Sequence, residues 1–276
     1  VAIIGECVLH SMKINSYIYK SSGNLNSAFV VKQNEVTSMD DMPWPESNMF
    51  EANNFNALQF RKVVSEYMTE MERLARRMLP LYAVALGVPE NYFEPAFKSP
   101  TMRMRLSMYP ALPLAKRVEE EGIKEVAIFE RQFGIAPHVD TTFFTILATS
   151  GPGLVVGFDK ARLEKKLNED IIGSNEFIEW VKIPFVEGTL LVNTGQLLRQ
   201  LTNDTWIAAR HYAVNPVRTS AVKSENHPNS RFSIPFFFNA TASYPLKVIS
   251  TFCSNDNPPK YPPLAYNKSQ GVTQGE

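Results

Sequence analysis

Apolar residues recur at helical spacing between Asn54 and Gly87, with arginine, lysine and glutamate between them. The apolar stripe consists of Phe60, Val63, Val64, Tyr67, Met71, Leu74, Met78 and Leu81. Because residues three or four apart share one face of an α-helix, this pattern predicts a long amphipathic helix over residues 55–87. Proline lacks the amide hydrogen that a helix interior needs, so we expect a break or kink near Pro80.

After Pro100, most of the chain shows alternation with a period of two, which is typical of β-strands. The strand signals cover residues 102–110, 144–147, 154–156, 180–184, 188–195 and 230–239. Many short strands separated by turn signals favour a sandwich or barrel over a parallel βαβ sheet. The charged stretch 159–175 predicts a short helix inserted between strands, and the charged run 115–124 predicts a solvated loop.

The strand predicted over residues 102–110 has one polar and one apolar face. Because side chains alternate between the two faces of a strand, the polar face carries Arg103, Arg105, Ser107 and Tyr109. The opposite face, which we expect to be core, carries Met104, Leu106 and Met108. Arg103, at the start of the strand, is as compatible with a solvent-facing position as with a functional one. Tyr109 precedes the proline that ends the strand and is better placed to point into a cavity.

His138 and Asp140 lie two residues apart in an extended segment, so their side chains project from the same face and can bind one ion together. Among the four histidines, His211 is the best candidate for a third ligand because it lies in another apolar, strand-like run. Two imidazoles and one carboxylate form the facial triad of non-haem Fe(II) oxygenases. A His-x-Asp triplet alone often occurs by chance. His227 lies among polar residues and is expected to be solvated, and His10 is interpreted in the same way.

The strand predicted over residues 230–239 also has two different faces. Its apolar face carries Phe232, Ile234, Phe236 and Phe238. The other face carries Arg231, Ser233, Pro235, Phe237 and Asn239. The guanidinium and hydroxyl form a fork for a carboxylate, because arginine offers paired donors and serine adds another. A surface arginine beside a surface serine is the simpler interpretation of this strand alone, but its position shortly after His211 favours the carboxylate site.

Composition and charge limit the kinds of partner that we expect. The chain has 276 residues, 44% of them hydrophobic and 11% aromatic, which is enough for one domain with a sizeable core. Lysine plus arginine and aspartate plus glutamate balance at 28 each, so no overall field attracts nucleic acid or an anionic membrane. The expected partner is a small molecule.

The cysteines and the apolar runs indicate a cellular location. Cys7 and Cys253 are far apart and lack metal-binding spacing, which suits free thiols in a reducing compartment. No apolar run reaches transmembrane length and no signal peptide is visible. We therefore expect a cytoplasmic location with no membrane association.

Taken together, these motifs resemble the iron- and 2-oxoglutarate-dependent dioxygenases, in the branch that includes isopenicillin N synthase and the plant flavonoid and gibberellin oxygenases. The resemblance runs from about Trp44 to Asn239. It rests on Trp44-Pro45, residues 86–93, Tyr109-Pro110, His138-Val139-Asp140, residues 188–195, Leu201-Thr202-Asn203, His211 and Arg231-Phe232-Ser233. So many motifs in one order are more specific than any single motif. The fold that the resemblance implies is mainly β, a double-stranded β-helix (distorted jelly roll) with flanking α-helices.

The resemblance also implies roles for individual residues and a division of the chain. It assigns Fe(II) to His138, Asp140 and His211. It assigns the distal carboxylate of 2-oxoglutarate to Arg231, Ser233 and Tyr109. Positions that line the substrate pocket in related enzymes match Arg105, Phe237 and Asn239. The single dioxygenase domain, residues 1–276, then comprises an N-terminal region and connection (1–54), the long helix (55–87), a jelly-roll core with the metal site (100–240) and a C-terminal segment (241–276).

The implied activity couples oxidative decarboxylation of 2-oxoglutarate by O2 to C–H oxidation of a small-molecule metabolite, by hydroxylation, desaturation or cyclisation, as in secondary metabolite biosynthesis. Two alternatives stay open. One is an Fe(II) oxidase like isopenicillin N synthase that does not use 2-oxoglutarate, because such oxidases keep a similar arginine and serine pair. The other is a non-catalytic jelly-roll binding module. The chain departs from the family in two places. It lacks the usual Ile-Pro-x-Ile-Asp-like first strand, which is typical of a truncated or divergent N-terminus. It also has a longer loop than usual between His211 and Arg231.

Overall fold

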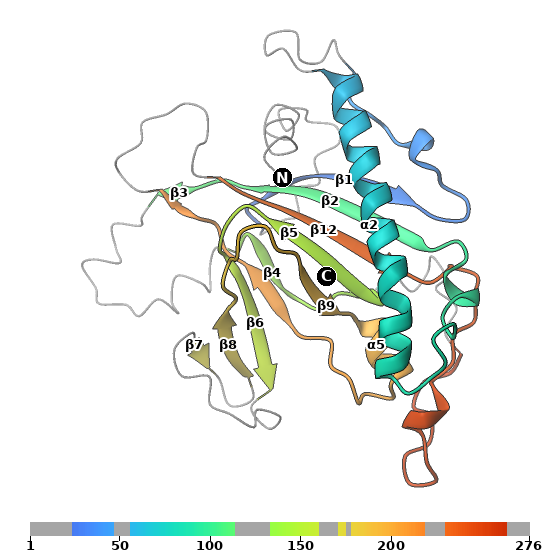
Figure 1. Ribbon diagram of the computed structural model, residues 1–276. Helices are drawn as coiled ribbons and strands as arrows, with labels where there is room; N and C mark the ends of the chain where they lie inside the picture. The colour runs from blue at the N-terminus through green and yellow to red at the C-terminus, as the bar shows by residue number, and fades with distance from the viewer. Residues whose placement is uncertain are drawn as a thin grey trace.

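The structure, a computed structural model, describes residues 24–46, 56–113, 133–159, 171–174, 178–218 and 230–263. These residues form two five-stranded sheets and a long helix (Figure 1). Our expectations for Cys7, His10, residues 115–124 and His227 lie outside the described residues. Among the described helices, none combines the length and apolarity that crossing a bilayer requires.

The larger sheet has the strand order β1-β2-β12-β5-β9, and every neighbouring pair in it is antiparallel. Its strands are β1 (Ser27–Gln33), β2 (Thr101–Tyr109), β12 (Arg231–Asn239), β5 (Phe144–Thr149) and β9 (Leu191–Thr194). The register pairs Ser233 of β12 with Ser107 of β2 and Arg231 with Tyr109. The polar faces of the two strands predicted from the sequence therefore lie on the same side of this sheet.

The smaller sheet has the strand order β4-β10-β6-β8-β7. Its strands are β4 (Ile135–His138), β10 (His211–Ala213), β6 (Leu154–Asp159), β8 (Ile178–Lys182) and β7 (Ile171–Ser174). A short parallel pair joins β3 (Leu112–Pro113) to β11 (Val217–Arg218). From β4 onward the chain passes repeatedly between the two sheets (Figure 1), which confirms the predicted jelly-roll fold.

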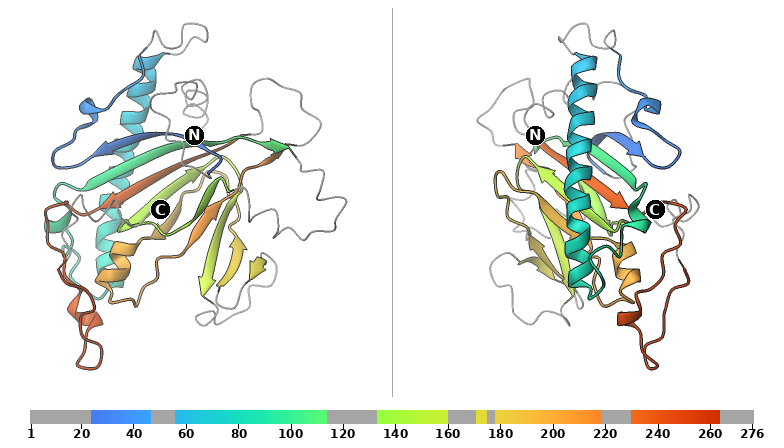
Figure 2. Two further views of the ribbon diagram at one scale, coloured as in Figure 1. Left: turned by 180° about the vertical axis from the view of Figure 1, so that it is seen from behind. Right: turned by 45° about the vertical axis from the view of Figure 1, so that its right-hand side comes forward.

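The long helix α2 (Ala57–Ala85) crosses the larger sheet on the side away from the smaller one (Figures 1 and 2). Its N-terminus is capped by Asn56, whose side chain accepts a hydrogen bond from the amide of Gln59. The helix continues through Pro80 without the expected break. Proline removes only one backbone hydrogen bond, and Leu79 and Ala83 on either side are buried in the core, which stabilises the uninterrupted helix.

The hydrophobic core lies between α2 and the larger sheet. The helix contributes residues such as Phe60, Val64, Met68 and Ala75. The strands contribute residues such as Met104, Leu106, Ile146, Ile234 and Phe236. Because side chains alternate along a strand, Ser107, Tyr109, Arg231 and Ser233 lie on the opposite face of the sheet, where they are also buried. That face therefore holds polar groups withdrawn from solvent.

The structure differs from the sequence-based expectations in three further elements. Within the charged stretch 159–175, for which we predicted a short helix, residues 160–170 and 175 lie outside the described residues, and residues 171–174 form strand β7. Pairing with β8 across one edge gives these residues their strand geometry. The short helix α5 (Gln196–Leu201) follows β9 directly, and strand β1 had no clear signal in the sequence. The remaining elements are short 3-10 turns: η1 (Met39–Asp41), η3 (Pro95–Phe97) and η5 (Ser250–Phe252).

Candidate metal centre

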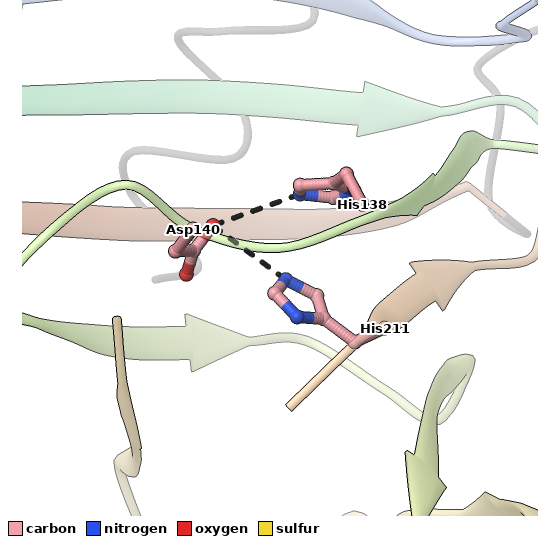
Figure 3. Close-up of side chains that lie close together, drawn as sticks. All are labelled: His138, Asp140 and His211. Atoms are coloured by element: carbon pink, nitrogen blue, oxygen red, sulfur yellow. Dashed lines mark ion pairs between the residues drawn. The ribbon is translucent and has the colours of Figure 1, made fainter. Parts of the chain in front are cut away.

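His138, Asp140 and His211 come together at one end of the smaller sheet (Figure 3). His138 ends β4 and His211 begins β10, and the two histidines are direct partners in the antiparallel register. Asp140 Oδ1 lies 3.6 Å from His138 Nε2 and 3.7 Å from His211 Nε2. The structure thus brings together the three side chains that the sequence nominated as metal ligands.

The Asp140 oxygen is spaced from each histidine nitrogen almost as one bound ion requires, and all three ligand atoms lie within 4.8 Å of one another. Two ligand atoms that each lie about 2.1 Å from an ion are roughly 3.0–3.5 Å apart. The observed separations exceed that range by only a few tenths of an ångström. No other group of three or more histidine, cysteine, aspartate or glutamate side chains among the described residues is arranged to hold a metal.

Backbone carbonyls orient both imidazole rings. His138 Nδ1 lies 2.8 Å from the carbonyl oxygen of Ala136, and His211 Nδ1 lies 3.1 Å from that of Ala209. A carbonyl oxygen can only accept, so each Nδ1 carries the hydrogen and each neutral ring presents an unprotonated Nε2. These are the nitrogen atoms that point toward Asp140.

The electrostatics of the site favour the metal-binding form of His138. Burial lowers the pKa of His138 below its usual value, and the nearby His211 lowers it further. The hydrogen bond to Ala136 and the charge of Asp140 oppose this shift only in part. Because a metal ion binds the neutral imidazole, the lowered pKa keeps His138 ready to bind at neutral pH.

Two side chains that the sequence analysis did not identify hold the Asp140 oxygen that faces away from the histidines. Thr145 Oγ1 donates to Asp140 Oδ2 at 2.8 Å, and Asn193 Nδ2 donates to the same oxygen at 2.9 Å. Thr145 is on β5 and Asn193 on β9, and the two are direct register partners. Their only sequence signal was membership of strand-like runs, because the contact depends on the pairing of β5 with β9.

The start of α5 holds the backbone around Asp140. Amides of three consecutive residues donate to it: Gly195 to the Phe143 carbonyl at 3.1 Å, Gln196 to the Asp140 carbonyl at 2.7 Å and Leu197 to the Thr142 carbonyl at 3.1 Å. Gly195 packs so closely that a Cβ atom there would lie 2.0 Å from the carbonyl oxygen of Thr142. The segment carrying the carboxylate is therefore fixed through both its backbone and its side chain.

Gly195→Ala is expected to destabilise the protein by about 1–3 kcal/mol or more, because the new methyl group overlaps a backbone atom that cannot move independently. Chemical denaturation of the metal-free protein measures this change. Gly151→Ala is the matched control, since a Cβ atom at Gly151 meets nothing within 4 Å. Equal stability of the two variants would contradict the close packing of β9 and α5 against the Asp140 segment.

A second polar cluster surrounds Arg231 on the polar face of the larger sheet. The Arg231 guanidinium lies 5.0 Å from the centre of the Tyr109 ring, and its Nε donates to the Gly151 carbonyl at 3.1 Å. Ser233 Oγ is 3.4 Å from the Tyr109 hydroxyl, with Ser107 opposite it in the register. The structure thus brings Arg231, Ser233 and Tyr109 together.

Arg231 is only 4% exposed, yet its Nη1 has no hydrogen-bond partner among the described residues. Burial lowers the pKa of Arg231 from its ordinary value, although the guanidinium stays charged. A buried donor without a partner is costly, and no acceptor among the described residues offsets that cost, so Arg231 Nη1 is available to an acceptor that binds beside it. A carboxylate matches this cationic group in charge and in geometry.

A cleft of about 310 Å³ lies beside Arg231. Arg231 is the only charged side chain among the described residues that line it. Leu147 and Leu191, register partners on β5 and β9, form part of its wall. Leu147 is two residues from Thr145, and Leu191 is two residues from Asn193; Thr145 and Asn193 are the two donors to Asp140. Because residues two apart on a strand share a face, the cleft and the metal centre lie on the same face of the sheet.

The three residues matched to the substrate pocket have different surroundings. Arg105 Nη2 donates to Asn26 Oδ1 at 2.6 Å, and the positive charge of Arg105 acts on His138. Phe237 is partly buried and pairs with Thr145 in the register. Asn239 Oδ1 accepts a hydrogen bond from the Phe143 amide at 2.7 Å, so this side chain supports the Asp140 segment. Arg103, for which two positions were open, is exposed.

Comparison with known proteins supports the geometry. Residues 114–240 match the model of the 2OG-Fe(II) oxygenase superfamily. The chain is 25% identical over 232 residues to the 2-oxoglutarate-Fe(II) type oxidoreductase hxnY of Emericella nidulans, covering 81% of this chain and 56% of that protein. It is 24% identical over 212 residues to the jasmonate-induced oxygenase 2 of Arabidopsis thaliana, covering 75% of this chain and 46% of that protein.

Solved structures share the fold. A full-length Neurospora crassa protein, solved in complex with alpha-KG and thymine, aligns with a TM-score of 0.64 and 21% identity, covering 89% of this chain and 63% of that chain. The present chain spans about half the length of the curated relatives it matches. These similarities establish the fold and extend over the segment that carries all three candidate metal ligands.

Proposed function

We propose that this chain, whose residues 114–240 match the model of the 2OG-Fe(II) oxygenase superfamily, is an Fe(II)- and 2-oxoglutarate-dependent dioxygenase acting on a small-molecule metabolite. The observation that carries the proposal is the pairing of two sites on one side of the larger sheet. One is a set of two imidazoles and a carboxylate, and the other is a buried guanidinium with an unused donor. A dicarboxylate that chelates a metal at one end needs both sites.

The residues present fit both groups. In this proposal Fe(II) is held by His138, Asp140 and His211, and the distal carboxylate of 2-oxoglutarate by Arg231, Ser233 and Tyr109. When bound, iron, 2-oxoglutarate and O2 together supply the oxidising power, with release of succinate and carbon dioxide. The chain contributes orientation: Arg231 fixes one end of the cosubstrate, and the apolar side chains of Leu147 and Leu191 keep water from its methylene groups.

The substrate is proposed to be a small organic molecule bound near the iron, on the side lined by Arg105 and Phe237. Asn239 contributes to the substrate site indirectly, because its side chain accepts a hydrogen bond from the Phe143 amide and so holds the Asp140 segment in position. The Neurospora crassa protein of similar fold was solved with thymine, which supports a metabolite of that size. Fungal and plant relatives support a place in secondary metabolism, where the outcome is hydroxylation, desaturation or cyclisation. The free thiol of Cys253 suits a cytoplasmic location.

Anaerobic addition of 2-oxoglutarate to the Fe(II)-loaded protein tests the function. A chelated 2-keto acid is expected to produce a visible charge-transfer absorption that saturates at one equivalent of 2-oxoglutarate per protein. On admission of air, succinate release is expected to require Fe(II), even without a substrate. Iron binding without this absorption would indicate an oxidase that does not use 2-oxoglutarate. Failure to bind iron would indicate a non-catalytic binding module.

A further inference from the structure

We propose that Thr145 and Asn193 are positioning residues that restrict Asp140 to metal binding through Oδ1 alone. The inference rests on the proposed function, because it concerns the same metal centre. It goes further by assigning a role to two side chains that do not touch the ion. Their task is to determine how many coordination positions the protein occupies.

The two oxygens of Asp140 have different surroundings. Oδ1 faces His138 Nε2 and His211 Nε2 at 3.6 and 3.7 Å. Oδ2 accepts hydrogen bonds from Thr145 Oγ1 at 2.8 Å and Asn193 Nδ2 at 2.9 Å. A carboxylate oxygen has two main acceptor directions, so two donors occupy the capacity of Oδ2. Turning Oδ2 toward an ion would break both hydrogen bonds.

The direction of the hydrogen bonds is set by the chemistry of the groups. An ionised carboxylate only accepts, so the Thr145 hydroxyl must donate to Asp140. Thr145 Oγ1 is also 3.1 Å from Thr142 Oγ1, and because its own hydrogen is committed, it accepts there. Thr142 and Thr145 are 3% and 2% exposed, so water does not compete for these hydroxyls. The Thr142 hydroxyl therefore donates to Thr145, and the Thr145 hydroxyl donates to Asp140 Oδ2.

The supports themselves are rigid. Thr145 and Asn193 are register partners on β5 and β9, so both donors approach from the same face of the sheet. The backbone of Asp140 is held separately by the Gln196 amide, at 2.7 Å from its carbonyl. With its backbone and Oδ2 both fixed, the carboxylate cannot rotate to offer two oxygens. The protein then fills three coordination positions and leaves the others to small molecules.

Titration of the metal-free protein with Co(II), followed by the visible absorption of the bound ion, tests the proposal without 2-oxoglutarate or O2. Thr145→Val and Asn193→Leu remove the donors while keeping side-chain size. Each is expected to weaken Co(II) binding by roughly 10- to 100-fold. Each is also expected to change the absorption spectrum, because a second carboxylate oxygen enters the coordination sphere. Thr145→Ser keeps the hydroxyl and is expected to restore both readouts.

Thr101→Val is the matched control, since Thr101 Oγ1 is buried but bonds to nothing among the described residues. Wild-type affinity and spectrum in both Thr145→Val and Asn193→Leu would overturn the proposal. Asn193 lies partly exposed on an edge strand, so Asn193→Leu decides the matter if Thr145→Val fails to fold. A wild-type protein that binds no Co(II) would instead overturn the proposed function and this inference with it.

Discussion

Arg231→Met is expected to weaken 2-oxoglutarate binding by about 2–5 kcal/mol, the usual effect of removing one partner of a buried charge pair. This corresponds to roughly 30- to 5,000-fold in Kd. The physical reason is that Arg231 is the only charged side chain among the described residues lining the cleft. Without it the distal carboxylate is buried with no opposite charge. Anaerobic titration of the Fe(II) protein with 2-oxoglutarate measures the Kd.

The same substitution is expected to leave the ligand-free protein as stable as the wild type, or more so. Arg231 is buried with an unpartnered Nη1, and methionine fills much of its volume without that cost. Thermal unfolding of the metal-free protein measures the difference. Arg77→Met, at an exposed position of α2, is the control for loss of one positive charge. Loss of stability together with unchanged affinity would mean that Arg231 serves the fold rather than the cosubstrate.

Asp140→Ala is expected to abolish Fe(II) binding and succinate release. The variant removes the only anionic ligand of the centre, and the two remaining imidazoles share no carboxylate to complete the set. Equilibrium dialysis against Fe(II) under anaerobic conditions measures binding, and succinate is measured after admission of air. Asp256→Ala, at an exposed position, is the control.

Loss of the Asp140 carboxylate also leaves Thr145 Oγ1 and Asn193 Nδ2 without their acceptor. Leaving a buried donor such as Thr145 Oγ1 unsatisfied costs about 1–3 kcal/mol, and the partly exposed Asn193 adds less, so metal-free Asp140→Ala is expected to be less stable than the wild type. Retained iron-dependent succinate release in a folded Asp140→Ala protein would refute the assignment of the metal centre.

The alternating faces of β2 and β12 could be predicted from the sequence because strand geometry alone decides which side chains share a face. That rule placed Arg231 with Ser233, and Tyr109 with Ser107, before any pairing was known. Similarly, the spacing of His138 and Asp140 required only an extended segment. The long helix was predictable from its apolar stripe, which is local information.

Other features depend on contacts between distant parts of the chain. Asn193 reaches Asp140 across 53 residues, and only the register of β5 and β9 brings them together. The uninterrupted course of α2 through Pro80 depends on packing against the sheet, which outweighs the local preference of proline. Strand β1 is stabilised mainly by its pairing with β2, and its own sequence gives a weak signal.

The direct pairing of His138 with His211 has a consequence for how the protein assembles. Strands β4 and β10 are distant in sequence, and loop closure delays such pairings during folding. An ion that needs both histidines cannot bind before β4 pairs with β10, so it binds and stabilises only the folded protein. Chelators should therefore accelerate global unfolding and heat inactivation, and loading with the ion should protect the purified protein during storage.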